Sequence, residues 1–222
     1  VERAKELGMN AFAISEHGSV MNWIKKKETI EADVKDDKGI IIQKGMKYIH
    51  ANEVYLTQHL DKEKGLVRDN FHYMMIAKNY DGVMELNKLT SNSFNREDGH
   101  FYYNPRISFD ELKSTSDNII MTSACLASPL WRLHHRAYDD FGVKDLQAKM
   151  ELEAMLQWMG DNRHRMFLEI QYHTHPQQVE FNQMLLRLSK ELKIPLIAGT
   201  DTHSLNAEHA NARTLFLKSK GA

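Results

Sequence analysis

The chain has 222 residues, 42% of them hydrophobic and 27% charged, and its formal net charge is −1. This composition excludes an intrinsically disordered chain, and the charge gives no overall basic field of the kind that indicates a nucleic-acid-binding protein. The single cysteine, Cys125, excludes an internal disulfide framework and indicates the reducing cytoplasm. We expect no membrane association, because no apolar run is long enough to span a bilayer.

We expect one domain over residues 1–222, since neither an internal repeat nor a low-complexity linker divides the chain. The first residues are typical of the back half of a helix that ends at Gly8, so part of the fold is expected to precede them. Short apolar runs predict six strands, at residues 11–15, 51–56, 73–77, 118–123, 166–170 and 195–199. Helical periodicity is clearest over residues 145–159 and 176–192. Because strands and helices alternate, a parallel α/β arrangement is favoured.

Two segments depart from this alternation. Residues 25–47 are strongly charged apart from the apolar run 40–42, and we interpret them as a helix tail followed by a hairpin-like excursion. Residues 95–106 mix charge, glycine, proline and three aromatic residues, a composition that predicts an ordered surface loop.

In an α/β barrel, the residues that carry out chemistry gather at the carboxyl ends of the strands and in the loops that follow. Four predicted strands are followed by polar or metal-capable side chains: Glu16 and His17, Cys125, Gln171 and His173, and Asp201 and His203. His72 precedes its apolar run, so this rule alone does not select it.

Each of these candidates also has a simpler explanation. Asp201 and His203 lie close enough along the chain to share a cation, but Asp201 is equally suited to capping the helix expected after it. Glu53 lies inside the apolar segment 50–56, where a carboxylate needs either a metal or a cationic partner such as lysine. Cys125 suits zinc as a thiolate, yet free cysteine is commonly a small buried hydrophobe. Most of the twelve histidines are expected at the surface.

The candidate residues suit the hydrolysis of phosphodiesters. That reaction needs a hydroxide at neutral pH and positive charge around the phosphorus, and clustered divalent metals supply both. His, Asp and Glu side chains supply the coordination. If Glu53 bridges two cations, it holds them a few ångströms apart, as two-metal sites require.

A series of segments resembles the PHP domain of bacterial-type DNA polymerase III alpha subunits. In chain order they are AFAISEHGSV, HANEVYL, FHYMMIAKNYDGVMELNKLTSNSF, NPRISFDEL, IIMTSACLASPL, MFLEIQYH and IPLIAGTDTH. Their order and approximate spacing agree with the family from residue 1 to residue 222. Each segment is modest alone, but the ordered series is specific.

The resemblance implies an α/β fold, a distorted seven-stranded (β/α) barrel of the PHP type, with up to three divalent metals (Zn, Mn or Mg). The metal-site positions it implies are His17, Glu53, His72, Cys125, Asp201 and His203, with Glu16 where the family usually has aspartate. Glu53, Asp201 and His203 are the residues expected to act in catalysis. The resemblance also accounts for His72, because the family's histidine likewise opens its strand.

Two departures from the family matter. The family's opening strand carries a His-x-His motif and a nearby aspartate, and this chain starts after that point, so we expect the first strand to be missing. The excursion at residues 25–47 is longer than in typical bacterial members, which favours a divergent, phage-borne polymerase.

The implied function is that of an N-terminal metal-dependent phosphoesterase domain in a replicative DNA polymerase, acting as a 3′–5′ proofreading exonuclease. One alternative is an inactive module that supports the polymerase or holds a partner, and another is a stand-alone small-molecule phosphatase of the histidinol-phosphate type. The implied partners are DNA, through the full polymerase, and replisome subunits such as the clamp and the exonuclease subunit. The basic clusters at residues 25–27 and 132–136 are candidates for phosphate contacts, although such clusters are usually solvated.

Overall fold

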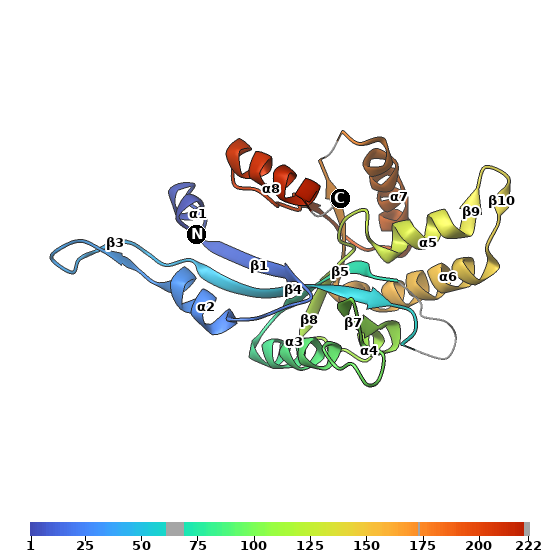
Figure 1. The fold of residues 1–222 in the computed structure, drawn as a ribbon, viewed down its shortest axis with the longest axis horizontal. Coiled ribbons are helices and arrows are strands. Elements are labelled where there is room, and N and C mark those ends of the chain that lie inside the picture. The colour runs from blue at the N-terminus through green and yellow to red at the C-terminus, as the bar shows by residue number, and fades with distance from the viewer. Residues whose placement is uncertain (61–68, 173, 220–222) are drawn as a thin grey trace.

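The computed structural model describes residues 1–60, 69–172 and 174–219, and its centre is an eight-stranded sheet that curls into an open half-barrel (Figure 1). Its strands are β1 (Ala11–His17), β4 (Lys47–Thr57), β5 (Phe71–Ala77), β6 (Phe101–Tyr102), β7 (Asn104–Ser108), β8 (Ile119–Thr122), β11 (Met166–Gln171) and β12 (Leu196–Gly199). Their order is β12-β11-β8-β5-β4-β7-β6, and β1 pairs with the first part of β4. The six predicted strands are confirmed as β1, β4, β5, β8, β11 and β12.

Helices lie between most of these strands. They are α1 (Glu2–Glu6), α2 (Trp23–Glu31), α3 (Tyr80–Ser93), α4 (Phe109–Lys113), α5 (Pro129–Ala137), α6 (Leu146–Asp161), α7 (Pro176–Leu192), α8 (Ala207–Ser219) and the short 3-10 helix η1 (Arg163–Arg165). The two clearest predicted helices are confirmed as α6 and α7. Asp145 caps α6 by accepting a 3.0 Å hydrogen bond from the Ala148 amide, and Pro176 occupies the first turn of α7.

The prediction of parallel strands is confirmed for β1 with β4, β4 with β7, β8 with β11 and β11 with β12, but it is wrong for β5. This strand runs antiparallel to both of its neighbours, β4 and β8. The described residues between β4 and β5, 58–60 and 69–70, form no helix. A parallel neighbour needs a long crossover, usually helical, whereas a strand that returns directly runs antiparallel. The start of β5 therefore lies at the edge where β4 ends.

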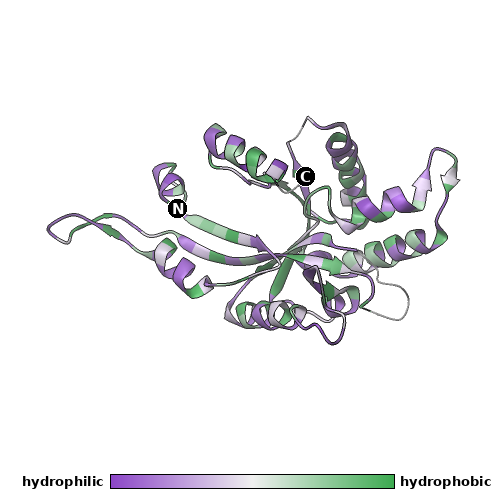
Figure 2. Ribbon diagram, viewed as in Figure 1, coloured by the Kyte–Doolittle hydropathy of each residue, from purple (hydrophilic) through white to green (hydrophobic). Residues whose placement is uncertain are grey.

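The main core lies between the sheet and the helices that cover it. Fully buried side chains come from the central strands and from α5, α6 and α7, for example Met75, Met121, Leu130, Met155 and Leu185. Figure 2 shows hydrophobic and hydrophilic residues interspersed along the helices, as expected for helices with one buried face. Among the described helices, none combines the length and the apolar character that crossing a bilayer requires.

The charged segment at residues 25–47 forms a helix and a hairpin, as predicted. It comprises the end of α2 and the antiparallel strands β2 (Val34–Lys35) and β3 (Ile41–Gln43). At the turn, Oδ1 of Asp36 accepts hydrogen bonds from the amides of Lys38 and Ile40, and Gly39 has a positive φ of 78°. The hairpin projects from the body as a narrow arm (Figure 1). A second small hairpin, β9 (Tyr138–Asp139) with β10 (Gly142–Val143), precedes α6.

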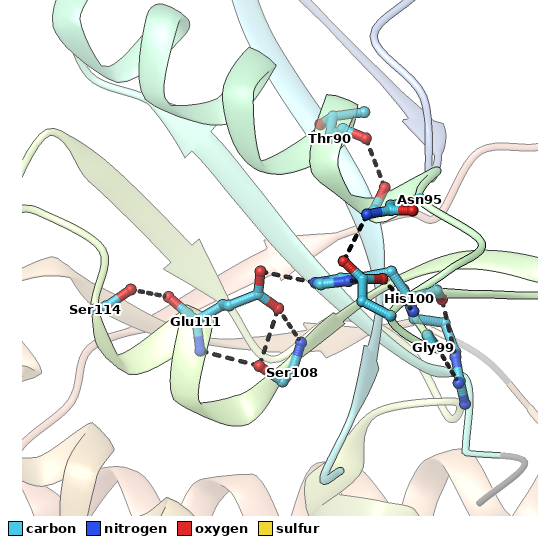
Figure 3. A network of polar contacts seen from close by, with 10 residues as sticks. Thr90, Asn95, Gly99, His100, Ser108, Glu111 and Ser114 are labelled. Atoms are coloured by element: carbon cyan, nitrogen blue, oxygen red, sulfur yellow. Dashed lines mark hydrogen bonds and ion pairs between the residues drawn. The ribbon is translucent and has the colours of Figure 1, made fainter. Parts of the chain in front are cut away.

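The prediction of a surface loop at residues 95–106 is wrong in part, because the segment contains β6 and enters β7. Arg106 is only 2% exposed, and its guanidinium donates hydrogen bonds to the carbonyl oxygens of Gly99 and His100. His100 in turn lies between two carboxylates, with Nδ1 2.6 Å from Asp98 and Nε2 2.9 Å from Glu111 (Figure 3). These contacts tie the segment into the sheet.

Candidate metal centre

Three adjacent strands bring His17, Glu53 and His72 together. His17 ends β1 directly opposite Glu53 of β4, and His72 stands at the start of β5. Each residue offers one ligand atom within 4.8 Å of the others. Nε2 of His17 lies 3.4 Å from Oε2 of Glu53, and Nδ1 of His72 lies 2.8 Å from Oε1. The reversed direction of β5 explains why a histidine that opens its strand reaches this edge of the sheet.

Glu53 is 4% exposed, and its two oxygens face different imidazoles. Burial raises the pKa of this carboxyl, but the hydrogen bond from His72 and the charges of His17, His72 and His203 outweigh burial and lower the pKa below its usual range. Glu53 is therefore a buried anion in contact with the imidazole nitrogens of His17 and His72. The alternative that a lysine pairs with Glu53 is not what the structure shows: the described ion pairs of this carboxylate are with His17 and His72.

Burial lowers the pKa of His72, but hydrogen bonds and charge interactions with Cys125 and Glu53 more than compensate and raise the pKa to about 9. At neutral pH and without a metal, His72 and Glu53 thus form an ion pair. A metal ion that takes this position has to displace the proton of His72.

Cys125 follows β8, and its Sγ lies 3.7 Å from Nδ1 of His72. The side chain is partly exposed and lines the same cavity as Glu53, so its surroundings differ from those of a core cysteine. The residue before it, Ala124, has a positive φ of 55°, an uncommon conformation for alanine that turns the chain toward the cavity.

Asp201 and His203 approach the group from the loop after β12. The His203 ring lies 5.9 Å from the His17 ring between centroids, and both loop residues line the cavity. Nδ1 of His203 lies 2.7 Å from the carbonyl oxygen of Asp201. The helix-capping explanation for Asp201 does not hold, since α8 begins six residues later and its first turn is capped by Asn206, which accepts a hydrogen bond from the His209 amide.

Glu16 stands apart from the three-residue group. Its carboxylate forms an ion pair with Lys26 of α2, although the residue also lines the cavity. The glycine after His17 is required by the turn: Gly18 has a φ of 61°, and a β-carbon there would lie 2.8 Å from Pro105. Its amide donates a 2.8 Å hydrogen bond to the Glu53 carbonyl, which fixes the end of β1 against β4.

His17, Glu53, Cys125, Asp201 and His203 line a cavity of about 890 Å³. Its polar lining includes Glu169 of β11, which the strand-end rule does not select. The signal for Glu169 is the one that singles out Glu53, a carboxylate inside an apolar strand. Gln171 also lines the cavity, as its position at the end of β11 predicts, and His173 lies outside the described residues.

Comparison with known proteins identifies the family. The model of the PHP domain matches residues 1–173. The chain belongs to the PHP domain family. Over 98% of its length, this PHP domain is 32% identical to the DNA polymerase III subunit alpha of Borreliella burgdorferi, and over 96% it is 32% identical to that of Campylobacter jejuni. The chain spans 17% of the length of each of these relatives.

The donor set of this PHP domain fits divalent metals. Imidazole and carboxylate suit zinc and manganese, and a thiolate in reach favours zinc. The buried anion Glu53, flanked by two imidazoles, is the arrangement in which a cation offsets the cost of burial. His17, Glu53 and His72 would form the first contacts, and Cys125, Asp201 and His203 line the cavity that His17 and Glu53 also line.

Three residues of the two basic clusters of this PHP domain make local ion pairs. Lys26 pairs with Glu16, Lys27 pairs with Glu31, and Arg136 makes a two-pronged contact with Asp69 at 2.7 and 3.2 Å. For these three residues the pairings favour the solvated-surface interpretation.

Proposed function

We propose that this PHP domain binds divalent metal ions in its cavity and hydrolyses phosphodiester bonds. The observation that carries the proposal is the meeting of His17, Glu53 and His72 from three strands, with ligand atoms within 4.8 Å of one another. A buried carboxylate needs a cation or an ion-pair partner, and imidazole and carboxylate ligand atoms this close together can bind one cation.

Each residue has a distinct role in this proposal. Bound metals would supply the hydroxide and the positive charge that phosphodiester hydrolysis requires. Glu53 presents one oxygen to each side, toward His17 and toward His72, and so is placed to bridge two cations. Asp201 and His203 approach His17 from the loop after β12 and would complete the coordination. Up to three ions would be held in this way.

We propose DNA 3′ ends as the substrate. Two observations support this: relatives that align with nearly the whole chain are DNA polymerase III alpha subunits, and a cavity of about 890 Å³ is large enough for a nucleotide. We propose that residues 1–222 form one domain that acts as a proofreading exonuclease. It would work in the cytoplasm beside a polymerase with its clamp and exonuclease subunits.

Degradation of 3′-labelled DNA tests the proposal. The purified protein is expected to shorten the label in the presence of Mn²⁺, Zn²⁺ or Mg²⁺, and Asp201→Ala is expected to abolish shortening. Asp110→Ala, which removes an exposed carboxylate paired with Lys113, serves as a matched control with full activity. An intact label with all three metals would overturn the nuclease proposal.

The ion pair between Glu53 and His72 favours a second candidate, a structural module, because the pair joins β4 and β5 without a metal. A metal-site variant such as His17→Ala distinguishes the two candidates. A lower melting temperature, with no nuclease activity in the wild-type protein, would favour the structural module.

A further inference from the structure

The turn that carries Cys125 is held by side-chain hydrogen bonds. Thr122 ends β8, and its hydroxyl oxygen accepts a 3.3 Å hydrogen bond from the amide of Ala124. Ala124 has a positive φ, which alanine adopts only where its surroundings impose it. Cys125 follows directly, with its Sγ toward His72. The position of the thiol therefore depends on the Thr122 hydroxyl.

Glu169 determines how that hydroxyl is oriented. Oε2 of Glu169 accepts a 2.7 Å hydrogen bond from the Thr122 hydroxyl. Because the hydroxyl has a single proton, donation to Glu169 leaves its lone pairs free for the Ala124 amide. The Glu169 amide also donates a 2.8 Å hydrogen bond to the Ser123 hydroxyl, so backbone and side chain of one residue hold both residues that precede Ala124.

The Glu169 carboxylate is itself fixed in place. Oε1 accepts a 3.0 Å hydrogen bond from the side-chain amide of Gln171, which is buried. On the neighbouring strand β12, Gly199 leaves the space that the carboxylate fills, since a β-carbon at position 199 would overlap Oε1 of Glu169. Glu169 is thus a partly buried carboxylate at the cavity wall with both oxygens oriented.

From these contacts we infer that Glu169 is a positioning residue for the metal centre, which holds the Thr122–Ala124 turn so that the Cys125 thiolate reaches the metal bound beside His72. The inference rests on the proposed metal site. It gives Glu169 a role distinct from that of Glu53, because Glu169 acts through the turn and not by direct contact with the other ligands.

Cobalt spectroscopy tests the role without relying on activity. The purified protein is titrated with Co²⁺ alone, and the near-ultraviolet thiolate-to-cobalt charge-transfer band is recorded. The wild-type protein is expected to show the band and Cys125→Ser to lack it. Glu169→Ala and Thr122→Val are expected to lose most of the band and to bind Co²⁺ about 10–100-fold more weakly. Thr122→Ser, which keeps the hydroxyl, is expected to retain both.

The outcomes separate the inference from the proposal beneath it. A wild-type spectrum without the band, or one that Cys125→Ser leaves unchanged, would remove the thiolate from the metal site and overturn the inference with it. A wild-type band that Glu169→Ala and Glu169→Gln both retain at full intensity would overturn the inference alone. Glu169→Gln keeps the shape of the side chain and replaces the alanine variant if that variant does not fold.

Discussion

Nδ1 of His72 lies 2.8 Å from Oε1 of Glu53, across the antiparallel pair of β5 and β4. Nε2 of His17 approaches the other oxygen of the same carboxylate at 3.4 Å. Glu53 is therefore the one carboxylate of the three-residue group, and each of its oxygens faces a different imidazole. This relationship makes its carboxylate the most direct target for a test of the metal site.

Glu53→Gln is expected to weaken Mn²⁺ binding by more than the roughly 10–100-fold that losing an outer partner of a metal ligand costs, because a neutral amide replaces the buried anion. Glu16→Gln provides the matched control on the neighbouring strand. Its carboxylate is paired with Lys26, so binding is expected to stay within about threefold of wild type. Equilibrium dialysis measures both variants. An equal loss of Mn²⁺ affinity in Glu53→Gln and Glu16→Gln would show that Glu16 is a metal ligand as well.

Metal binding is expected to strengthen as pH rises from 7 to 9, by up to about tenfold per unit, because the bound ion displaces the proton that His72 holds with a pKa of about 9. Calorimetry in buffers with different heats of ionisation counts the protons released. His72→Asn should release one proton fewer. Folding stability of the metal-free protein depends on pH in the opposite direction. The raised pKa of His72 contributes stability that is fully present below pH 6.5 and is lost as pH rises through 9. A proton count that His72→Asn leaves unchanged would contradict the assignment.

His100 predicts a second pH dependence, away from the metal centre. Burial lowers its pKa, but the hydrogen bonds and charges of Asp98 and Glu111 raise it above the ordinary value. A raised folded-state pKa contributes stability that is fully present below the unfolded value of 6.5 and is lost as pH rises through the folded value.

The melting temperature of His100→Gln should accordingly fall furthest below that of the wild type in mildly acidic buffer. The gap in melting temperature between the two proteins should narrow in alkaline buffer. His164→Gln, which removes an exposed imidazole paired with exposed Asp117, is expected to show little change in melting temperature. A gap of constant size across this pH range would argue against a charged His100.

Two glycines in helices predict stability changes of opposite sign. A β-carbon at Gly82 of α3 would overlap the carbonyl oxygen of Asn118, so Gly82→Ala is expected to destabilise the fold by about 2–3 kcal/mol. At Gly160 of α6 the new atom would meet only Leu192, at an ordinary 3.5 Å, and Gly160→Ala is expected to stabilise by about 0.5 kcal/mol. Urea unfolding measures both, and a neutral Gly82→Ala would contradict the close contact between α3 and Asn118, the residue before β8.

The sequence predicts the strands well because each is a short apolar run bounded by turn residues, as with residues 11–15 and 166–170. The sequence does not predict strand direction. Nothing in residues 73–77 shows whether this strand runs parallel or antiparallel to the strand before it. For the same reason the strand-end rule misses His72, whose place at the metal centre follows from the reversal of β5.

Long-range pairing also decides the remaining misses. Residues 95–106 have the composition of a loop, and they enter the sheet because β7 pairs in parallel with β4, Arg106 opposite Tyr55. Glu169 becomes a site residue only when Thr122, Gln171 and Gly199 are brought around it from three strands. The sequence marks Glu169 as a carboxylate inside an apolar strand, but it does not show which partners the fold brings to that carboxylate.

The position of β5 in the sheet has a consequence for local unfolding. Paired on both sides by β4 and β8, the strand is expected to exchange its amide hydrogens only when the whole sheet opens, whereas the described part of β12 pairs on one side only, with β11. His72 lies two residues before the part of β5 that is paired on both sides, residues 74–76, whereas Asp201 and His203 follow the edge strand β12, which is expected to exchange faster. An ion bound by His72 together with Asp201 and His203 would link the edge strand β12 to the central strand β5 and would be expected to slow local unfolding at that edge.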